Sequence, residues 1–336
     1  MNRRTWWLLA TAIAVLALAA SANSLGNGFV YDDVHLIQRA PRIHSLEGWW
    51  REFARTYWPQ SAGGDGYRPL TIIAFRVEWA LGGGSPMPFH ATNIALHLGG
   101  AIAVFWLACA VLPIAAAWLV GALYAVHPVH VEAIANGVGQ SELAVALLLA
   151  LAVALYLHGR RNGPLTRMRW GAIAALYAAA CLFKEHGVVL PGLLLLAEAT
   201  VVRDTVPLRQ RVVTLRPAFL VLVLIAVGYL WTRSAVVAEG VTGFRPFIVF
   251  RALQLSPSNR VLTMVGVAPE WLRLFLWPAR LMTEYTPMYL DVAQRVSITQ
   301  LPGLLVLLGT IGLGAATWRR SPATSFGIGW LVLTLL

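Results

Sequence analysis

The sequence predicts an all-α, polytopic membrane protein, and three observations support that fold class. Of its 336 residues, 58% are hydrophobic and only 12% are charged, and the mean hydropathy is +0.66. Soluble domains carry roughly 25% charged residues, so this composition excludes a soluble globular protein. Several runs of about 14 to 24 residues carry little or no charge, and a spanning helix needs ~20. Basic residues gather in the short loops between these runs, as the positive-inside rule describes.

The charge balance and the cysteines fit the same class. The net charge is +11, from 26 Lys and Arg against 15 Asp and Glu. Because the excess lies in short loops, membrane topology explains it and no nucleic-acid partner is required. Cys109 and Cys181 each sit inside an apolar run, so neither indicates a disulfide framework or a metal site.

The first helix is predicted from about Trp6 to Leu25, after the basic start Arg3-Arg4. Ala20-Ser21-Ala22 also resembles a signal-peptide cleavage site, and either interpretation sends the next segment outside. That segment, Gly26 to Pro88, is too long and too polar for a hairpin between spans. We therefore expect a large first extracytoplasmic loop, with an amphipathic interfacial helix at Leu70 to Leu81.

Five more helices are predicted in the middle of the chain, and arginine-rich loops after the third and fifth of them mark the cytoplasm. Their approximate ranges are Phe89 to Leu112, Ile114 to Val126, Val138 to Leu157, Trp170 to Phe183 and Val188 to Val202. The second range has only thirteen residues, which is short for a span. We therefore expect it to continue past His127 toward Ile134.

Two further spans are predicted at Pro217 to Trp231 and at Leu304 to Trp318. The first of these spans leaves the cytoplasm after the arginine-rich loop, and the second returns to it because it ends in Arg319-Arg320. The segment from Thr232 to Gly303 must then stay outside, so Val261 to Trp277 is predicted to be an interfacial or re-entrant helix. The last run, Phe326 to Leu336, is too short to span. We therefore expect a single membrane domain over residues 1–336 that is truncated at its C-terminus.

This threading places four polar clusters on the extracytoplasmic side. They are Asp32-Asp33, the corner from His127 to Glu142, Lys184-Glu185, and the segment from Arg260 to Glu284. Ionisable residues at membrane depth are costly, so a functional role is the default interpretation. Four clusters on one side predict one site.

Asp32-Asp33 is the candidate for acid–base chemistry. Two adjacent carboxylates repel each other, which can raise the pKa of one of them and suit it to act as a general base. The alternative is a solvated loop turn.

His127 and His130 can share one helix surface, while Glu132 faces elsewhere. A metal site would need a third convergent ligand, and no zinc-type spacing such as H-E-x-x-H is present. Hydrogen bonds or phosphate contacts, a metal site, and plain helix-end polarity therefore stay open for this pair.

Lys184 is the sole lysine of the chain. A compact ammonium at an outer helix end could meet a phosphate as a point charge. The alternative is a snorkelling lysine paired with its neighbour Glu185. Arg68 and Arg260 are the other candidates for binding an anion.

Common nucleotide and hydrolase motifs are missing from the sequence. It contains no Walker-type phosphate loop, no dinucleotide fingerprint and no G-x-S-x-G motif. An activated substrate would therefore arrive through the lipid phase or from the outer compartment.

At these residues the sequence resembles the transmembrane and tetratricopeptide-repeat O-mannosyltransferases and their bacterial relatives, within the GT-C superfamily of glycosyltransferases. The motifs recur in order along most of the chain. They are Phe29-Val30-Tyr31-Asp32-Asp33, Tyr67-Arg68-Pro69-Leu70, Phe75-Arg76, Phe89-His90, Asn93, Leu96-His97, His127-Pro128-Val129-His130-Val131-Glu132-Ala133, Gly139, Glu142-Leu143, Lys184-Glu185, Gly187, Arg260, Leu262-Thr263 and Pro278.

The resemblance implies a GT-C-like helical bundle whose first outer loop carries interfacial helices and the catalytic acid. It implies transfer of a sugar, mannose in this family, from a polyprenyl-phosphate carrier to a hydroxyl acceptor on protein. The lipid-linked donor is then a co-substrate, and no metal or other cofactor is required. The active site is expected to face outside a bacterial cell membrane, and a tetratricopeptide array is expected after the membrane part.

The resemblance also suggests roles for the site residues. The run Asp32-Asp33-Val34-His35 resembles the Asp-Glu-Val-His run of protein O-mannosyltransferases in the same superfamily, in which the first acid is catalytic. This resemblance implies that Asp32 is the catalytic base and that Asp33 tunes or orients it. The donor phosphate and the substrate are expected to contact Arg68, His127, His130, Glu132, Lys184, Glu185 and Arg260. Two positions depart from the family pattern: Gln140 replaces a frequent arginine, and Glu284-Tyr285 replaces an Asp-containing pair.

Two other function classes are alternatives. In a secondary transporter the buried charges would form an ion path, but such proteins commonly show internal repeats and broken helices near the midplane. No repeat is visible here, and the charges fall at outer helix ends. The other alternative is a non-catalytic membrane scaffold for a repeat array.

Overall fold

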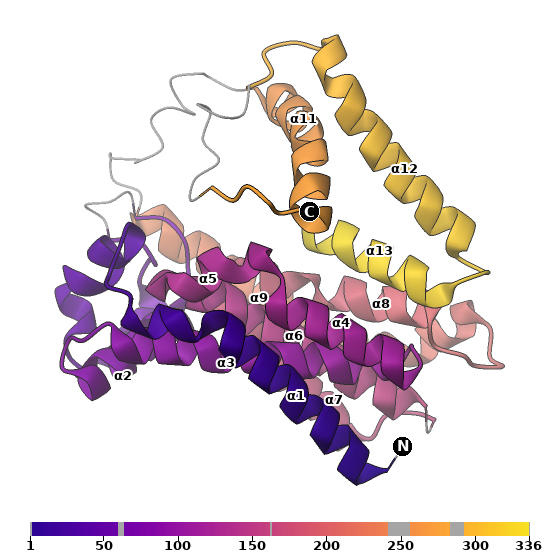
Figure 1. Ribbon diagram of the computed structural model, residues 1–336, viewed down its shortest axis with the longest axis horizontal. Coiled ribbons are helices and arrows are strands. Elements are labelled where there is room, and N and C mark those ends of the chain that lie inside the picture. Colours follow the sequence, from indigo (N-terminus) through magenta and orange to yellow (C-terminus); the bar gives the residue numbers. More distant parts are fainter. Residues whose placement is uncertain (1, 60–63, 162, 241–255, 283–291, 336) are drawn as a thin grey trace. The chain divides into compact units, whose positions relative to one another are not determined.

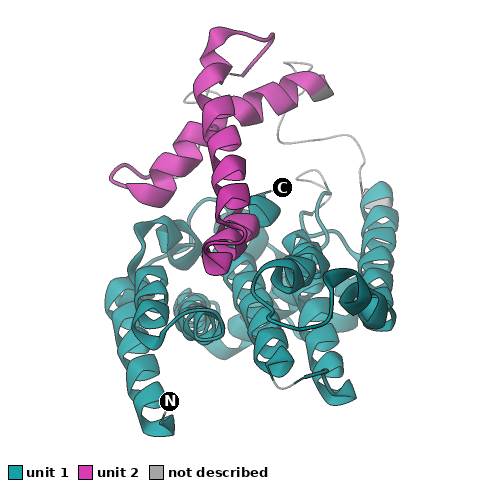
Figure 2. Cartoon of the chain, turned by 90° about the vertical axis from the view of Figure 1, so that its right-hand side faces the viewer, with its two compact units in different colours: residues 1–244, 332–336 teal, residues 245–331 magenta. Residues whose placement is uncertain are grey.

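The computed structural model describes residues 2–59, 64–161, 163–240, 256–282 and 292–335. These residues form helices and loops without a strand, which confirms the predicted all-α class (Figure 1). The chain divides into two compact units. One comprises residues 1–244 with 332–336, shown in teal in Figure 2, and the other comprises residues 245–331, shown in magenta.

The helices fall close to the predicted ranges. In the first unit they are α1 (Arg3–Ser21), α2 (Pro69–Gly82), α3 (Met87–Ala108), α4 (Ile114–Val126), α5 (Val131–Ala135), α6 (Gln140–Arg160), α7 (Arg167–Phe183), α8 (Leu190–Thr200) and α9 (Leu208–Gly240). The remaining helices are α11 (Pro257–Leu276), α12 (Leu301–Thr317) and α13 (Pro322–Leu335). The expected helices in the first loop and at 261–277 are thus present as α2 and α11.

The protein is a multi-pass membrane protein. Five segments in the described residues are long and apolar enough to cross a membrane: Arg3–Gly26, Met87–Ala108, Gly137–Arg160, Leu208–Ala238 and Ile298–Thr317. A sixth is possible if α4 and the helical stretch after it, bent by 43°, form one broken span. The sequence predicted eight spans. If the bent pair counts as a sixth span, the two remaining helices are α7 and α8. The 17 residues of α7 are at the short end of the ~17–25 that a span needs, and the 11 residues of α8 are below it.

The predicted continuation past His127 toward Ile134 is present only as a second helical stretch, Pro128–Ala135, bent by 43° from α4, and not as an unbroken helix. The helix ends at Val126, and His127 is extended, with φ −68° and ψ 123°. Proline disfavours helical geometry at the residue before it, and Pro128 follows directly. The chain re-enters helical geometry as a short 3₁₀ turn, Pro128–His130, and then α5.

Small residues let the first helices pack closely. A core of α1, α3 and α4 is built from Ala10, Ile13, Ala17, Ala101, Phe105, Ala108, Ala117 and Ala125. A Cβ on Gly121 of α4 would lie 2.8 Å from both Ile13 and Phe105. Membrane helices use small residues in this way because close backbone approach increases van der Waals contact.

The first loop is folded, with its own core. Leu36, Ile37, Ile43 and Tyr57 of the loop are buried against Ile72 and Phe75 of α2 and Phe89 of α3. A buried carboxylate strengthens this layer: Glu52 accepts a hydrogen bond of 2.8 Å from Nη1 of Arg76. The loop therefore holds its polar residues in fixed positions at one end of the first unit.

Candidate functional site

Asp33 fastens the first loop to the turn that precedes α6. Its side chain is fully buried and accepts hydrogen bonds from the N–H groups of Gly137 (3.0 Å) and Val138 (2.8 Å). Burial raises the pKa of Asp33, while these backbone hydrogen bonds oppose the rise by favouring the charged carboxylate. Asp33 is therefore placed to hold the loop in position.

Asp32 is exposed, although its neighbour is buried. Tyr31, just before it, has φ +46° and is the one non-glycine residue in the described ranges with a left-handed backbone. Such a conformation costs of order 1–3 kcal/mol and persists where the surrounding structure enforces it. The strained turn buries Asp33 and leaves Asp32 on the surface of the site.

Arg68 is paired with Glu185. Its Nε and Nη2 donate to the two carboxylate oxygens of Glu185 at 3.1 and 2.8 Å, and its guanidinium lies 4.6 Å from the ring centroid of Tyr57. Burial opposes ionisation of Glu185, but the hydrogen bonds and charge of Arg68 outweigh it and lower the pKa of Glu185 to about 2. The predicted alternative, in which Lys184 pairs with Glu185, is therefore wrong.

Lys184 is buried at the C-terminal end of α7, and its Nζ pairs with the carboxylate of Glu142 in the first turn of α6. Burial, together with the nearby charge of Arg68, lowers the pKa of Lys184 to about 8. A Cβ on Gly187 would lie 2.5 Å from the backbone nitrogen of Cys181, so only glycine lets this turn fold back on α7. The turn fixes the position of the ammonium group.

Electrostatic interactions connect these groups into one cluster. The charges of Lys184 and Asp32 both act on the carboxyl group of Glu132. The charges of Arg68 and Asp32 both act on the hydroxyl group of Tyr57. The structure thus brings together five of the predicted site residues: Asp32, Arg68, Glu132, Lys184 and Glu185.

The two predicted histidines lie at the break after α4. Nδ1 of His127 accepts a hydrogen bond of 3.2 Å from the N–H of Val129, which caps the short 3₁₀ turn. The ring of His130 lies 4.4 Å from Tyr124 and 5.4 Å from His97, measured between centroids. Among the described residues, no three His, Cys, Asp or Glu side chains are grouped as metal ligands. This histidine pair therefore has no third ligand in that part of the chain.

Arg260 lies in the second unit, exposed in the first turn of α11. The cluster around Asp32 is built from the first unit alone. Glu284, at the end of the segment predicted to contribute to the site, and its neighbour Tyr285 fall outside the described residues.

Three side chains of the cluster were absent from the predicted site. Glu142 was part of a recognised motif, but its partner Lys184 is 42 positions away and no local pattern joins them. Tyr57 beneath Arg68 and Tyr229 of α9, whose hydroxyl donates to the carbonyl of Tyr67 at 3.2 Å, also depend on tertiary packing. Sequence spacing carried no signal for these contacts.

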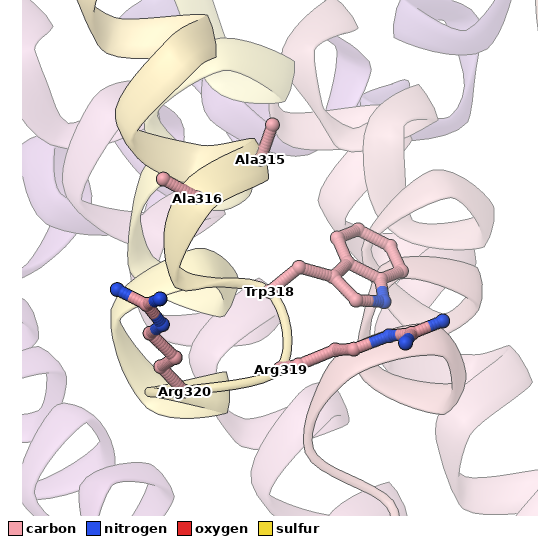
Figure 3. Close-up of a pocket in the computed structure, with 5 residues that line it drawn as sticks. All are labelled: Ala315, Ala316, Trp318, Arg319 and Arg320. Carbon is pink, nitrogen blue, oxygen red and sulfur yellow. The ribbon is translucent and has the colours of Figure 1, made fainter.

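A separate pocket lies in the second unit, at the turn after α12. It is lined by Ala315, Ala316, Trp318, Arg319 and Arg320 (Figure 3). Figure 3 shows Trp318 and Arg319 on one side of the turn and Arg320 directed to the other. Its arginines belong to the set that the positive-inside rule assigns to the cytoplasm. None of the predicted site residues lines this pocket.

The chain is similar in sequence to curated protein O-mannosyl-transferases. It is 35% identical over 185 residues to Protein O-mannosyl-transferase Tmtc2 of Drosophila melanogaster, covering 52% of this chain and 20% of that protein. It is 31% identical over 207 residues to Protein O-mannosyl-transferase TMTC3 of Homo sapiens, covering 59% of this chain and 22% of that protein. The chain thus spans about a fifth of the length of these relatives. The similarity confirms the resemblance predicted from the motifs.

No family model matches the chain. No solved structure matches it either.

Proposed function

We propose that this chain is the membrane part of a protein O-mannosyltransferase. It would transfer mannose from a polyprenyl-phosphate carrier to a hydroxyl group of an acceptor protein. The observation that carries the proposal is the placement of exposed Asp32, fixed by buried Asp33, in one cluster with Arg68 and Lys184. The names of the similar proteins support the same reaction class.

In the proposed reaction, Asp32 takes the proton of the acceptor hydroxyl as its oxygen attacks C1 of the mannose. The bond between C1 and the phosphate oxygen breaks, and polyprenyl phosphate leaves with the bonding electrons. Arg68 and Lys184 stabilise the negative charge of the departing phosphate, and no metal is needed for this step. Glu185 and Tyr57 hold the guanidinium of Arg68 in a fixed orientation.

We propose that the site faces outside the cell membrane of a bacterium. Glu142 lies near the start of α6 and Arg160 at its end, eighteen residues later. At 1.5 Å per residue these positions are ~27 Å apart, close to the thickness of the hydrocarbon core. Arg160 and Arg161 belong to the basic loop expected in the cytoplasm, so the cluster around Asp32 falls at the opposite membrane surface.

A transfer assay tests the proposal. The full chain in lipid nanodiscs is mixed with polyprenyl-phosphate mannose and a serine- and threonine-containing acceptor peptide, and mass spectrometry measures the added hexose. We expect transfer by the wild-type chain. A folded protein with intact Asp32 that binds the donor but transfers no sugar would contradict the enzyme assignment and favour the scaffold alternative.

A further inference from the structure

The ion pair between Lys184 and Glu142 joins one fixed and one movable side chain. The side chain of Lys184 is only 10% exposed, and its backbone N–H donates to the carbonyl of Ala180 at 3.0 Å. The side chain of Glu142 is 48% exposed. The carboxylate can therefore swing into solvent, while the ammonium group stays where the end of α7 places it.

The charge balance of the cluster disfavours a further anion as long as this pair is closed. Four carboxylates, Asp32, Glu132, Glu142 and Glu185, surround the cations Arg68 and Lys184. Arg68 already makes two hydrogen bonds to Glu185. A donor phosphate brings another negative charge, and like charges at short range repel, most strongly where the shared cation is buried, as Lys184 is. One carboxylate must leave its cation for the phosphate to bind.

We infer that Glu142 is a displaceable counter-ion of Lys184, which occupies the ammonium group in the empty site and yields it to the phosphate of the donor. The inference rests on the proposed function, in which Lys184 binds that phosphate. Glu142 is then a positioning residue that sets donor affinity, whereas Asp32 does the chemistry.

The low exposure of the Lys184 side chain and the high exposure of the Glu142 side chain explain why exchanging Glu142 for a phosphate costs little. A buried ammonium without a partner is strongly unfavourable, so Lys184 needs an anion before the donor arrives. A half-exposed carboxylate is rehydrated when it is displaced, and pairs of this kind contribute only modestly to stability. Donor binding thus replaces one anion by another and never leaves the buried charge unpaired.

The sole lysine of the chain provides a direct measurement. An amine-acetylating reagent applied at pH 7 modifies only Lys184 and the α-amino group, and peptide mass spectrometry quantifies the two separately. The full chain in nanodiscs is treated with this reagent at increasing concentrations of polyprenyl phosphate. We expect the lipid phosphate to protect Lys184. In Glu142→Gln we expect the half-protecting concentration to fall about three- to tenfold, because the phosphate no longer competes with a carboxylate.

A matched control is Glu47→Gln, which removes an exposed carboxylate of the first loop and should leave the half-protecting concentration unchanged. If Glu142→Gln fails to fold, Glu142→Asp keeps the charge on a shorter side chain and should give a smaller gain. Equal or weaker protection in the Glu142 variants would overturn the inference, since a purely structural pair predicts no gain. Absence of protection in every chain, wild type included, would instead refute the proposed donor.

Discussion

Asp32 and Asp33 are adjacent in the chain, but one side chain is exposed and the other is fully buried. The sequence spacing of the two aspartates could not show which of them is the base. The buried position of Asp33 depends on the N–H groups of Gly137 and Val138, which are more than 100 positions away. The family resemblance favoured Asp32 as the base. The geometry supports the same choice, since a base must be reached by its acceptor.

At the residue scale we predict different consequences for the two aspartates. A general base contributes about 10² to 10⁴ in rate, so Asp32→Asn should lose nearly all transfer while keeping its thermal stability and its donor binding. Asp33→Asn should lower the melting temperature, since an unsatisfied buried group costs ~1–3 kcal/mol, and should reduce transfer less. Near-normal transfer by Asp32→Asn would refute the assignment of Asp32 as the general base. A larger loss of transfer in Asp33→Asn than in Asp32→Asn would indicate that Asp33 is the base.

A second prediction at this scale concerns Lys184. Removing it in Lys184→Ala should weaken donor binding by roughly 1.5 to 3 kcal/mol, the range of a charge-assisted hydrogen bond. The donor KM reports this change. If Lys184→Ala has the same donor KM as the wild type, Lys184 does not bind the donor and its role is purely structural.

The lowered pKa of Lys184 predicts a pH dependence. Burial and the charge of Arg68 bring this pKa from 10.5 to about 8, so the ammonium loses its proton mainly between about pH 7 and pH 9, where an ordinary lysine stays charged. Donor affinity should therefore be full well below pH 8 and fall as the pH rises through that value. Lys184→Arg, which stays charged, should abolish the decline, and a titration of donor binding from pH 6 to 10 measures it. An identical decline in both chains would assign the titration to another group.

At the scale of elements, the sequence predicted most helices and missed the features that depend on tertiary contacts. Apolar runs located α1, α3, α6 and α12 well, because long periodic segments are strong signals. The break after α4 follows from Pro128, which is a local signal in the sequence. The prediction gave more weight to the length of the apolar run, because thirteen residues are short for a span. Hydropathy also could not reveal that the first loop forms a packed layer on α2.

The buried pair of Arg76 on α2 and Glu52 in the first loop gives a prediction for that layer. Arg76→Ala removes the shortest ion pair of Glu52, a carboxylate that is 1% exposed, but leaves Arg42 and Arg55 at 3.6 and 3.5 Å from it. We therefore expect a cost of ~1–3 kcal/mol, the range for a lost hydrogen bond to a charged group. We expect a lower melting temperature and, because the loop carries Asp32, reduced transfer. Arg51→Ala, an exposed arginine of the same loop, is the matched control and should change stability by less than ~0.5 kcal/mol. Equal melting curves for both variants would contradict a stabilising role for the pair.

At the scale of the whole molecule, the basic loops predict the topology and hence the side of the membrane on which the site lies. In a background with Cys109 and Cys181 replaced by alanine, single cysteines at Asp65 and Ser256 should react with an impermeant thiol reagent in intact cells. A cysteine at Thr205, in the arginine-rich loop before α9, should react only after the membrane is permeabilised. Labelling at Thr205 with protection at Asp65 would invert the topology and place Asp32 in the cytoplasm.

The hydrogen bonds of Asp33 to Gly137 and Val138 also constrain when the site can form during biosynthesis. The first loop is synthesised early, but its anchor lies about a hundred residues later in the chain. At 5–20 residues per second, translation needs roughly 5 to 20 s to supply that anchor. Over this interval Asp33 lacks the backbone N–H groups that hold the first loop in position. At every round of synthesis, the first loop therefore stays incomplete until the turn before α6 has been made.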